Sequence, residues 1–224
     1  MYWLFQKGAD MKKYLLLITA VIFLCAFLPV LAQDLQIGVI AGINFASLTE
    51  KGYEQYHTIR TCGGAGGVVE LGLNKKLSIC LEPLYMQKGG NKLGTEFELA
   101  YFEVPVFVKF HLQTDLPRIY LKAGPALGIV LSSKMDVSGL DGSTMVEIND
   151  IMKTYDYGML FGGGVSFAIG NSLLFFEGRY ALGLADIIQE GKIVVNGQEQ
   201  ASPEAEMKTR GFQVMAGMTF PIQF

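Results

Sequence analysis

The sequence predicts an all-β fold, namely an eight-stranded antiparallel up-and-down transmembrane β-barrel. The first observation is the end of the chain, where every second side chain from Phe212 to Phe224 is apolar and most of the intervening ones are small or polar. Such alternation indicates a strand with one apolar face, and an aromatic residue closes it at the membrane boundary. Two further observations are the number of such segments and the lengths of their connections.

Eight segments show this alternation along the chain. In most of them, glycine and charged residues occupy one parity, and Leu, Val, Ile, Phe and Tyr crowd the other, as a strand with two unlike faces requires. In chain order, the predicted strands cover residues 35–48, 63–74, 77–90, 99–112, 118–134, 154–169, 173–186 and 209–224.

The connections between these segments alternate strictly between long and short. The tight turns are Asn74 to Lys76, Gln113 to Pro117 and Gly170 to Ser172. The long connections are residues 49–62, 91–98, 135–153 and 187–208. Bacterial outer-membrane barrels have an even strand count, short periplasmic turns and long outside loops, so both chain ends are expected on the periplasmic side.

The N-terminal residues predict export from the cytoplasm. Lys12 and Lys13 form a basic region, residues 14–28 are apolar, and Val30-Leu31-Ala32 supplies a small residue for cleavage. The apolar run is shorter than the roughly 20 residues of a membrane-spanning helix. We therefore expect a cleaved signal peptide.

The predicted organisation is one barrel domain after this leader. Residues 1–32 comprise an upstream extension and the signal peptide, with cleavage near Ala32, and residues 33–224 form the outer-membrane β-barrel domain. Cleavage removes three lysines and one aspartate from totals of 18 basic and 21 acidic residues, which leaves 15 against 20. This acidic balance predicts no nucleic-acid partner.

The distribution of glycine predicts which face of the wall points inward. Most strand glycines share the parity of the charged residues; Gly67, Gly163 and Gly178 are exceptions. The interior of an eight-stranded barrel is cramped, so small residues belong there and the apolar face meets lipid. The predicted aromatic girdles are Tyr85, Phe102, Tyr155 and Tyr157 at the outer boundary, and Phe110, Phe167, Phe176 and Phe224 at the inner one.

The same parity directs nine charged side chains into the lumen. They are Glu70, Glu82, Lys88, Glu103, Lys109, Lys122, Asp156, Glu177 and Arg179. Charges removed from bulk water must pair, so we expect a structural ion-pair network that plugs and braces the barrel. A proton path or a catalytic carboxylate pair is the alternative use of these residues.

Two outer loops contain hairpin signals. Asp141-Gly142 and Asn196-Gly197 lie between β-forming residues, which is the strongest short-range turn signal. We expect the strands on either side of residues 135–153 to continue as a ribbon beyond the membrane, and the same is open for 187–208. Such edges could add a protein partner's strand, or they could merely keep the loops ordered.

The residues favour no catalytic or cofactor site. Cys62 and Cys80 are too far apart along neighbouring strands for a disulfide, and no cluster has metal-ligand spacing. A hydrolase at the outer leaflet would have to combine His57 with Ser47 or Glu54, because His111 is expected at the opposite end. We therefore predict no catalytic, cofactor-binding or metal-binding residue and no cofactor.

A series of motifs resembles the PorT-like outer-membrane β-barrel domain family. The series consists of Gly38-Val39-Ile40-Ala41-Gly42-Ile43-Asn44, Glu82-Pro83-Leu84-Tyr85, Tyr101-Phe102-Glu103-Val104-Pro105-Val106, Ala123-Gly124-Pro125, Asp156-Tyr157-Gly158 and Arg179-Tyr180. The resemblance spans the mature chain and implies an eight-stranded barrel in the outer membrane of a diderm bacterium. It implies no single activity, although the founding type is associated with type IX secretion.

The leading functional hypothesis is a non-enzymatic outer-membrane barrel with a closed polar lumen. It would act through loops 135–153 and 187–208, either by binding a surface partner or by supporting the envelope. The alternative is an accessory role in type IX secretion, and the remote one is the outer-leaflet hydrolase. Expected partners are outer-membrane lipid and the barrel-insertion machinery, which would read the C-terminal strand through Phe220, Ile222 and Phe224.

Overall fold

The computed structural model describes most of the chain beyond the predicted signal peptide. The described residues are 34–50, 57–92, 95–112, 115–139, 142–147, 152–188, 192–195, 198–201 and 207–222. The predicted leader and the terminal Phe224 lie outside them. Within these residues, no helix has the length and apolar character needed to cross a bilayer.

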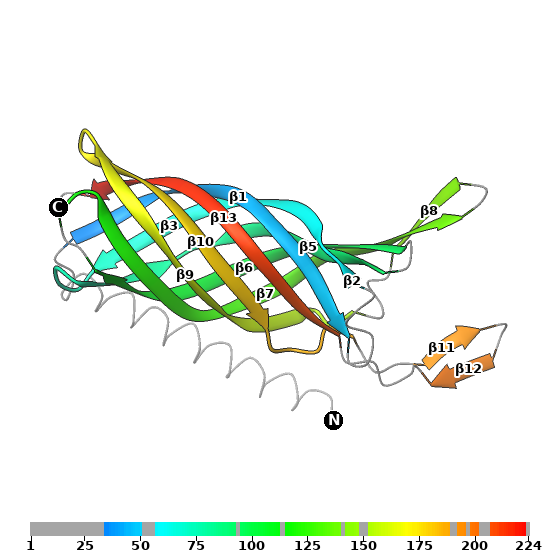
Figure 1. Cartoon of the computed structure of the whole chain (residues 1–224). Coiled ribbons are helices and arrows are strands. Elements are labelled where there is room, and N and C mark those ends of the chain that lie inside the picture. The colour runs from blue at the N-terminus through cyan, green and yellow to red at the C-terminus, as the bar shows by residue number, and fades with distance from the viewer. Residues whose placement is uncertain are drawn as a thin grey trace, which may run out of the picture.

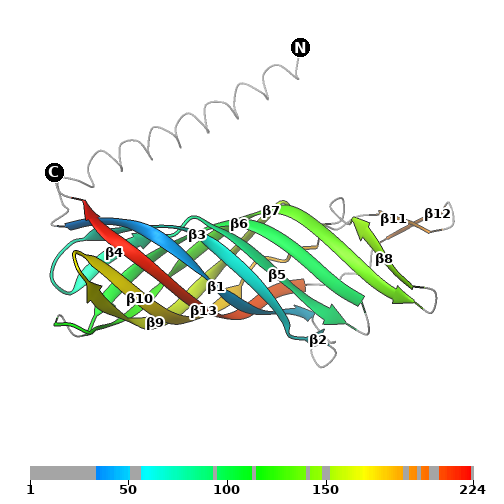
Figure 2. The same ribbon diagram turned by 90° about the horizontal axis from the view of Figure 1, so that it is seen from above.

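Nine strands form a closed antiparallel wall in the described part of the chain (Figures 1 and 2). They occupy eight positions in the wall, called staves here, because β4 and β5 together fill one position. Each stave pairs with the next along the chain, and the last returns to pair with the first, so the ring closes. The staves are β1 (Asp34–Glu50), β3 (Arg60–Gly72), β4 (Leu77–Leu81) with β5 (Leu84–Lys92), β6 (Thr95–His111), β7 (Arg118–Gly139), β9 (Tyr155–Ile169), β10 (Ser172–Gly183) and β13 (Met207–Ile222). The predicted eight-stranded up-and-down fold is confirmed.

The third stave differs from its prediction as one continuous strand. It is interrupted between β4 and β5 at Glu82 and Pro83, because proline has no N–H to donate to the ladder. The carbonyl oxygen of Pro83 still accepts a hydrogen bond from Gly67 N at 3.0 Å, and Glu82 N donates to Pro105 O at 3.1 Å. The wall therefore remains closed across the break.

The short connections follow their sequence signals. In the turn between β3 and β4, Asn74 Oδ1 accepts hydrogen bonds from Lys76 N at 2.9 Å and Leu77 N at 3.0 Å. Gly170, between β9 and β10, has φ +61°, a left-handed conformation that glycine adopts without strain. These turns gather at one end of the barrel, called here the short-turn end.

The opposite end, called here the long-loop end, carries additional strands. β7 runs past the rim and forms a hairpin with β8 (Gly142–Glu147), as the Asp141-Gly142 signal predicts (Figure 1). β7 thus pairs with β9 along the barrel and with β8 beyond it, so the predicted ribbon is present in the described residues; residues 148–151, between β8 and β9, lie outside them. β11 (Lys192–Val195) and β12 (Gln198–Ala201) form a separate two-stranded sheet around the Asn196-Gly197 signal, and β2 (His57–Thr58) pairs with β5.

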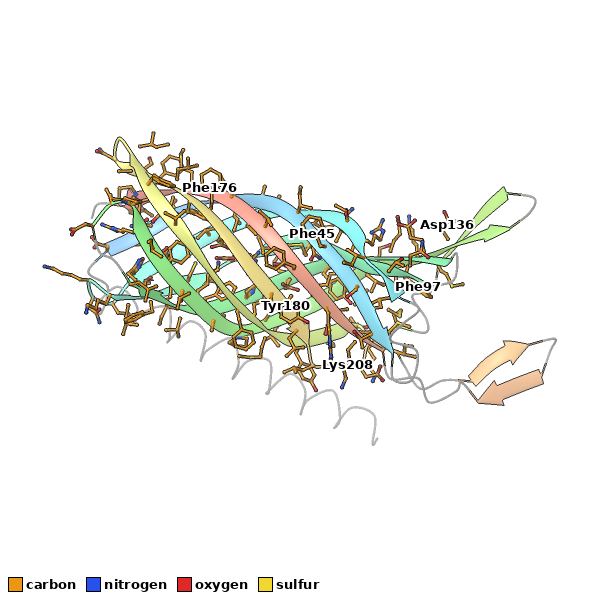
Figure 3. All side chains as sticks on the ribbon, in the orientation of Figure 1. Phe45, Phe97, Asp136, Phe176, Tyr180 and Lys208 are labelled. Carbon is orange, nitrogen blue, oxygen red and sulfur yellow. The ribbon has the colours of Figure 1, made fainter. Side chains whose placement is uncertain are left out.

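The two faces of the wall differ as glycine parity predicts. Apolar side chains are exposed around the barrel, including Phe45, Phe176 and Tyr180, which are labelled in Figure 3. The aromatic girdle residues within the described range are exposed in the same way. Exposed apolar residues over a closed antiparallel wall are suited to a surrounding of lipid.

Inward glycines let neighbouring strands approach closely. A Cβ placed on Gly124 would lie 1.8 Å from the carbonyl oxygen of Val106 on β6, a distance that no side chain tolerates. The inner face consequently offers little free volume, and the charged residues share it with a few large side chains.

Candidate functional site

The lumen contains all nine of the charged residues selected by parity. Each is buried, with between 1% and 8% of its surface exposed. They form three clusters along the barrel, and the central one is the most completely buried.

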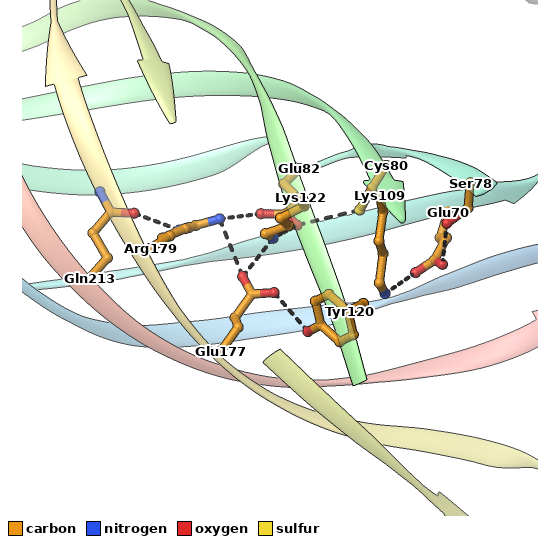
Figure 4. A network of polar contacts seen from close by, with 10 residues as sticks. All are labelled: Glu70, Ser78, Cys80, Glu82, Lys109, Tyr120, Lys122, Glu177, Arg179 and Gln213. Carbon is orange, nitrogen blue, oxygen red and sulfur yellow. Dashed lines mark hydrogen bonds and ion pairs between the residues drawn. The ribbon is translucent and has the colours of Figure 1, made fainter. Parts of the chain in front are cut away.

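Four charges from three parts of the wall meet in the central cluster (Figure 4). Lys122 Nζ, on β7, lies 2.6 Å from Glu82 Oε1 and 2.6 Å from Glu177 Oε1. Arg179 Nη1 pairs with Glu82 Oε2 and lies 3.5 Å from Glu177 Oε1. Two acids and two bases thus neutralise one another in a closed arrangement.

Neighbouring side chains bond to this cluster from several strands. Arg179 Nε donates to Gln213 Oε1 on β13 at 2.6 Å, and Tyr120 OH donates to Glu177 Oε2 at 2.9 Å. Lys122 Nζ also lies 4.2 Å from the centre of the Phe107 ring, a favourable cation–π position. These bonds satisfy buried polar atoms that would otherwise be costly.

A second cluster lies toward the short-turn end. Lys109 Nζ pairs with Glu70 Oε2 at 2.7 Å, and Ser78 Oγ donates to Glu70 Oε1 at 2.8 Å. His111 Nε2 lies 3.3 Å from Ser78 Oγ and 3.6 Å from Glu70 Oε1. A cavity of about 320 Å³ beside this cluster is lined by Glu70, Ser78, His111 and charged residues of the turns.

The Ser78, His111 and Glu70 group does not have the geometry of a nucleophilic triad. In a triad, the histidine takes the serine proton with one ring nitrogen and donates to the carboxylate with the other. Here a single nitrogen, Nε2, faces both partners, the serine hydroxyl bonds to the carboxylate, and Ser78 is 2% exposed. The arrangement serves pairing rather than nucleophilic attack.

The third cluster lies toward the long-loop end. Lys88 on β5 pairs with Glu103 Oε2 on β6, and its Nζ is 3.8 Å from Asp156 Oδ2 on β9. Thr209 Oγ1 donates to Asp156 Oδ2 at 3.1 Å. Two carboxylates here share one lysine, so this cluster carries the excess acid of the lumen.

An apolar layer covers the third cluster at the barrel mouth. Its buried members are Leu48, Leu99, Tyr101, Met152, Ile187 and Met207, referred to below as the cap. Met152 and Ile187 come from the long connections rather than from strands, and Met152 forms an isolated bridge with Ile188. The lumen is therefore closed by apolar side chains above and by ion pairs below.

Asp186 holds the connection that supplies Ile187. Its Oδ1 accepts hydrogen bonds from Met207 N at 2.9 Å and Ile188 N at 3.2 Å, and its Oδ2 pairs with Lys153 Nζ at 3.2 Å. Burial acts to raise the pKa of Asp186, but the two backbone N–H groups and the Lys153 ammonium outweigh burial and keep that pKa below its usual value. The carboxylate therefore stays ionised and fastens the cap.

Only Ser47 of the predicted outer-leaflet candidate has a described side chain. The side chains of His57 and Glu54 lie outside the described residues, while Ser47 is on β1, where it pairs in register with Arg210. Cys62 and Cys80 are both free and buried, as the predicted strand register requires. Among the described residues, no group of three or more acidic, histidine or cysteine residues could hold a metal ion.

Sequence reasoning missed two parts of this site. Tyr120 has the same parity as Lys122 on its strand, and Gln213 has the same parity as the glycines Gly211 and Gly217 on its own, so those signals could have found them. The contributions of Met152 and Ile187 to the cap had no signal, since neither belongs to an alternating segment. Their role depends on how the connections fold back over the mouth.

The closed antiparallel wall, apolar outside and ion-paired inside, defines an integral outer-membrane β-barrel protein. The chain belongs to the family of the outer membrane protein beta-barrel domain, whose model matches residues 31–189. This family places the protein in the outer membrane of a Gram-negative bacterium. No curated protein matches the sequence.

One solved structure with a TM-score above 0.5 shows the same fold, and two others are similar at lower scores. The outer membrane protein OprG of Pseudomonas aeruginosa aligns with a TM-score of 0.52 and 14% identity over 86% of this chain and 97% of OprG. Neisserial surface protein A has a TM-score of 0.46 and 16% identity over 82% of this chain and 96% of its own. Ail of Yersinia pestis, solved with the heparin analogue sucrose octasulfate, has a TM-score of 0.42 and 13% identity over 84% and 100%.

Proposed function

We propose that this protein is a non-enzymatic, non-conducting outer-membrane barrel that acts through its long loops, by binding a surface partner or supporting the envelope. The observation that carries the proposal is the double closure of the lumen. A solute would have to displace the cap and then break the central ion pairs, of which Arg179 and Lys122 are at most 3% exposed. What remains available for interaction is the long-loop end.

The long-loop end is assigned to the cell exterior. Barrels of this kind place short turns in the periplasm and long loops outside, and here the short connections all gather at the end opposite β8. Export would begin with cleavage of the signal peptide near Ala32. Insertion would use the C-terminal strand, where Phe220 is exposed toward lipid and is followed by Ile222 and Phe224.

The hairpin of β7 and β8 is the part of this surface best suited to a protein partner. β7 extends to Gly139 and pairs with β6 as far as Val137, opposite Thr95; Phe97 and Asp136, labelled in Figure 3, lie in this last paired stretch. Among the described strands, β8 pairs only with β7, so its second edge could accept an extended segment by main-chain hydrogen bonding.

The test removes the loops while keeping the closure of the barrel. Residues 140–150 and 189–205 would be replaced by short turns in separate variants, with Met152, Asp186, Ile187 and Met207 retained. We expect normal folding and membrane insertion, together with the surface-binding or envelope phenotype of the full deletion strain. A matched control would shorten residues 113–116, at the opposite end, and should leave that phenotype unchanged.

Full complementation by both loop variants would contradict this proposal. The alternative, suggested by the PorT-like motifs, is an accessory role in type IX secretion. It predicts exported proteins missing from the secretome of the deletion strain, whereas a loop-presenting barrel leaves the secretome intact. Comparing secreted and outer-membrane proteomes therefore separates the two functions.

A further inference from the structure

A small polar chamber lies between the central cluster and the cap. Its volume is about 20 Å³, and a cavity of roughly 10–15 Å³ by this measure suffices for one water molecule. The polar residues around it come from five strands and include Asn44, Lys88, Glu103, Asp156, Thr209 and Gln213. The chamber is thus about one or two water molecules in size and is polar on several sides.

Four of these side chains present polar atoms with no hydrogen-bond partner among the described residues. They are Asn44 Oδ1, Glu103 Oε1, Asp156 Oδ1 and Gln213 Nε2. Each side chain belongs to a residue that is at most 4% exposed. Buried polar atoms are rarely left unpaired, because desolvation without a hydrogen bond is costly. Their convergence on one chamber indicates a shared partner.

The orientations of the two amides are fixed by their other bonds. Asn44 Nδ2 donates to the carbonyl oxygen of Gln87 at 2.9 Å, which leaves Asn44 Oδ1 as the unpaired atom, next to Gly211 of the chamber lining. Gln213 Oε1 accepts from Arg179 Nε at 2.6 Å, so Gln213 Nε2 must be the free group. The chamber is consequently lined by three acceptors and at least one donor.

We propose that this chamber is a binding site for ordered water, which bridges the Glu103 and Asp156 cluster to the Arg179 and Gln213 side of the central cluster. Water donates two hydrogen bonds and accepts others, so one molecule can satisfy two of the three acceptors and the Gln213 donor together. The site is independent of the loops and would unite the two clusters into one brace.

The surroundings favour water over a metal cation. A bare cation would meet the Gln213 amide hydrogens and the Lys88 ammonium, both of which repel positive charge. The charged or titratable groups that face Asp156 from the other strands are Lys88 on β5, and Tyr101 and Glu103 on β6. Both signs of charge are represented, which suits a neutral molecule that donates and accepts.

A pair of variants with the same shape tests whether the chamber needs a hydrogen-bonding group. Ala181 lines it and is 9% exposed, and threonine and valine at this position add equal bulk but differ in one hydroxyl. Any cost of overfilling is therefore common to both. We expect Ala181→Val to unfold at a temperature lower than Ala181→Thr by roughly 2–4 °C, because a methyl group displaces water without replacing its hydrogen bonds. A higher unfolding temperature for Ala181→Val would indicate a dry apolar cavity and overturn the proposal.

The water itself is tested on the unmodified protein. In detergent micelles, we expect a nuclear Overhauser cross-peak between a long-lived water and the Gln213 side-chain amide, and its loss in Ala181→Val. Absence of that cross-peak in the native protein would overturn the proposal. So would a heat stability that depends on sodium or potassium rather than choline at equal ionic strength, since the occupant would then be a metal cation.

Discussion

Lys122 on β7 and Glu177 on β10 meet at 2.6 Å across the lumen, although 55 residues separate them in the chain. The same ammonium group is equally close to Glu82. Lys122 thus links β7 to β10 and to the third stave, three parts of the wall that are not adjacent, so its energetic effect concerns the barrel as a whole. The central cluster should therefore respond sharply when one charge is removed.

Replacing Arg179 with methionine should lower the free energy of unfolding by about 3–5 kcal/mol, because Glu82 and Glu177 would then share only Lys122 while buried. The measurement is the denaturation midpoint of the folded band in gel mobility. Arg210→Met, an exposed arginine on β13, is the control and should change stability by less than about 0.5 kcal/mol. Adding Glu82→Gln to Arg179→Met should restore part of the loss, and unchanged stability of the single variant would contradict the bracing role.

Acid should loosen the cap through Asp186. Because the folded state holds the pKa of this carboxyl below its usual value, the stabilisation is complete above the unfolded value of about 3.9 and is lost as pH falls through the lower folded value. We expect the hydrogen-exchange protection of the Ile188 and Met207 amides to drop in that window. Asp186→Asn cannot titrate, so its protection should not change there. An identical pH response in both proteins would rule out Asp186 as the fastening group.

The close approach of strands predicts a sharp contrast between two glycines. Alanine at position 124 would place Cβ 1.8 Å from the backbone oxygen of Val106, whereas alanine at position 67 would meet nothing nearer than 3.8 Å. Gly124→Ala should therefore fail to give a heat-resistant folded band, since backbone must move in the wall. Gly67→Ala should fold with near-native stability. Equal behaviour of the two variants would show that the inner wall is not as tightly packed as described.

The closed lumen predicts an absence of conductance. Purified protein in a planar bilayer should show no steady single-channel current, since both the cap and the central ion pairs block the axis. Replacing Met152 and Ile187 with serine should still give no open channel, because the ion pairs remain. Steady current through the native protein would contradict the sealed lumen and the function proposed from it.

The sequence was sufficient to predict the barrel wall, but not the ion-pair partners and the cap that close the lumen. Alternation with period two predicted the eight staves, because each must present one face to lipid and the other to a narrow interior. The break at Pro83 could have been expected from the missing N–H. The choice of partners could not, since which acid meets Lys122 depends on the stagger of strands around the ring.

The cap shows a different limit of sequence reasoning. Met152 and Ile187 lie in the long connections, each next to one other apolar residue, Ile151 or Ile188, and neither pair belongs to an alternating pattern. Only the path of the chain over the mouth brings them beside Leu48 and Tyr101. Periodicity carries no information about such contacts.

The hydrogen bond from Ile187 N to Met207 O, at 2.9 Å, holds together the two ends of the loop between these residues. The chain between these two residues is a loop whose ends are held together. The entropic cost of closing such a loop grows only slowly with its length. Insertions and substitutions in residues 189–205 should therefore accumulate without reaching the barrel. This surface can therefore diversify while the barrel beneath it stays constant.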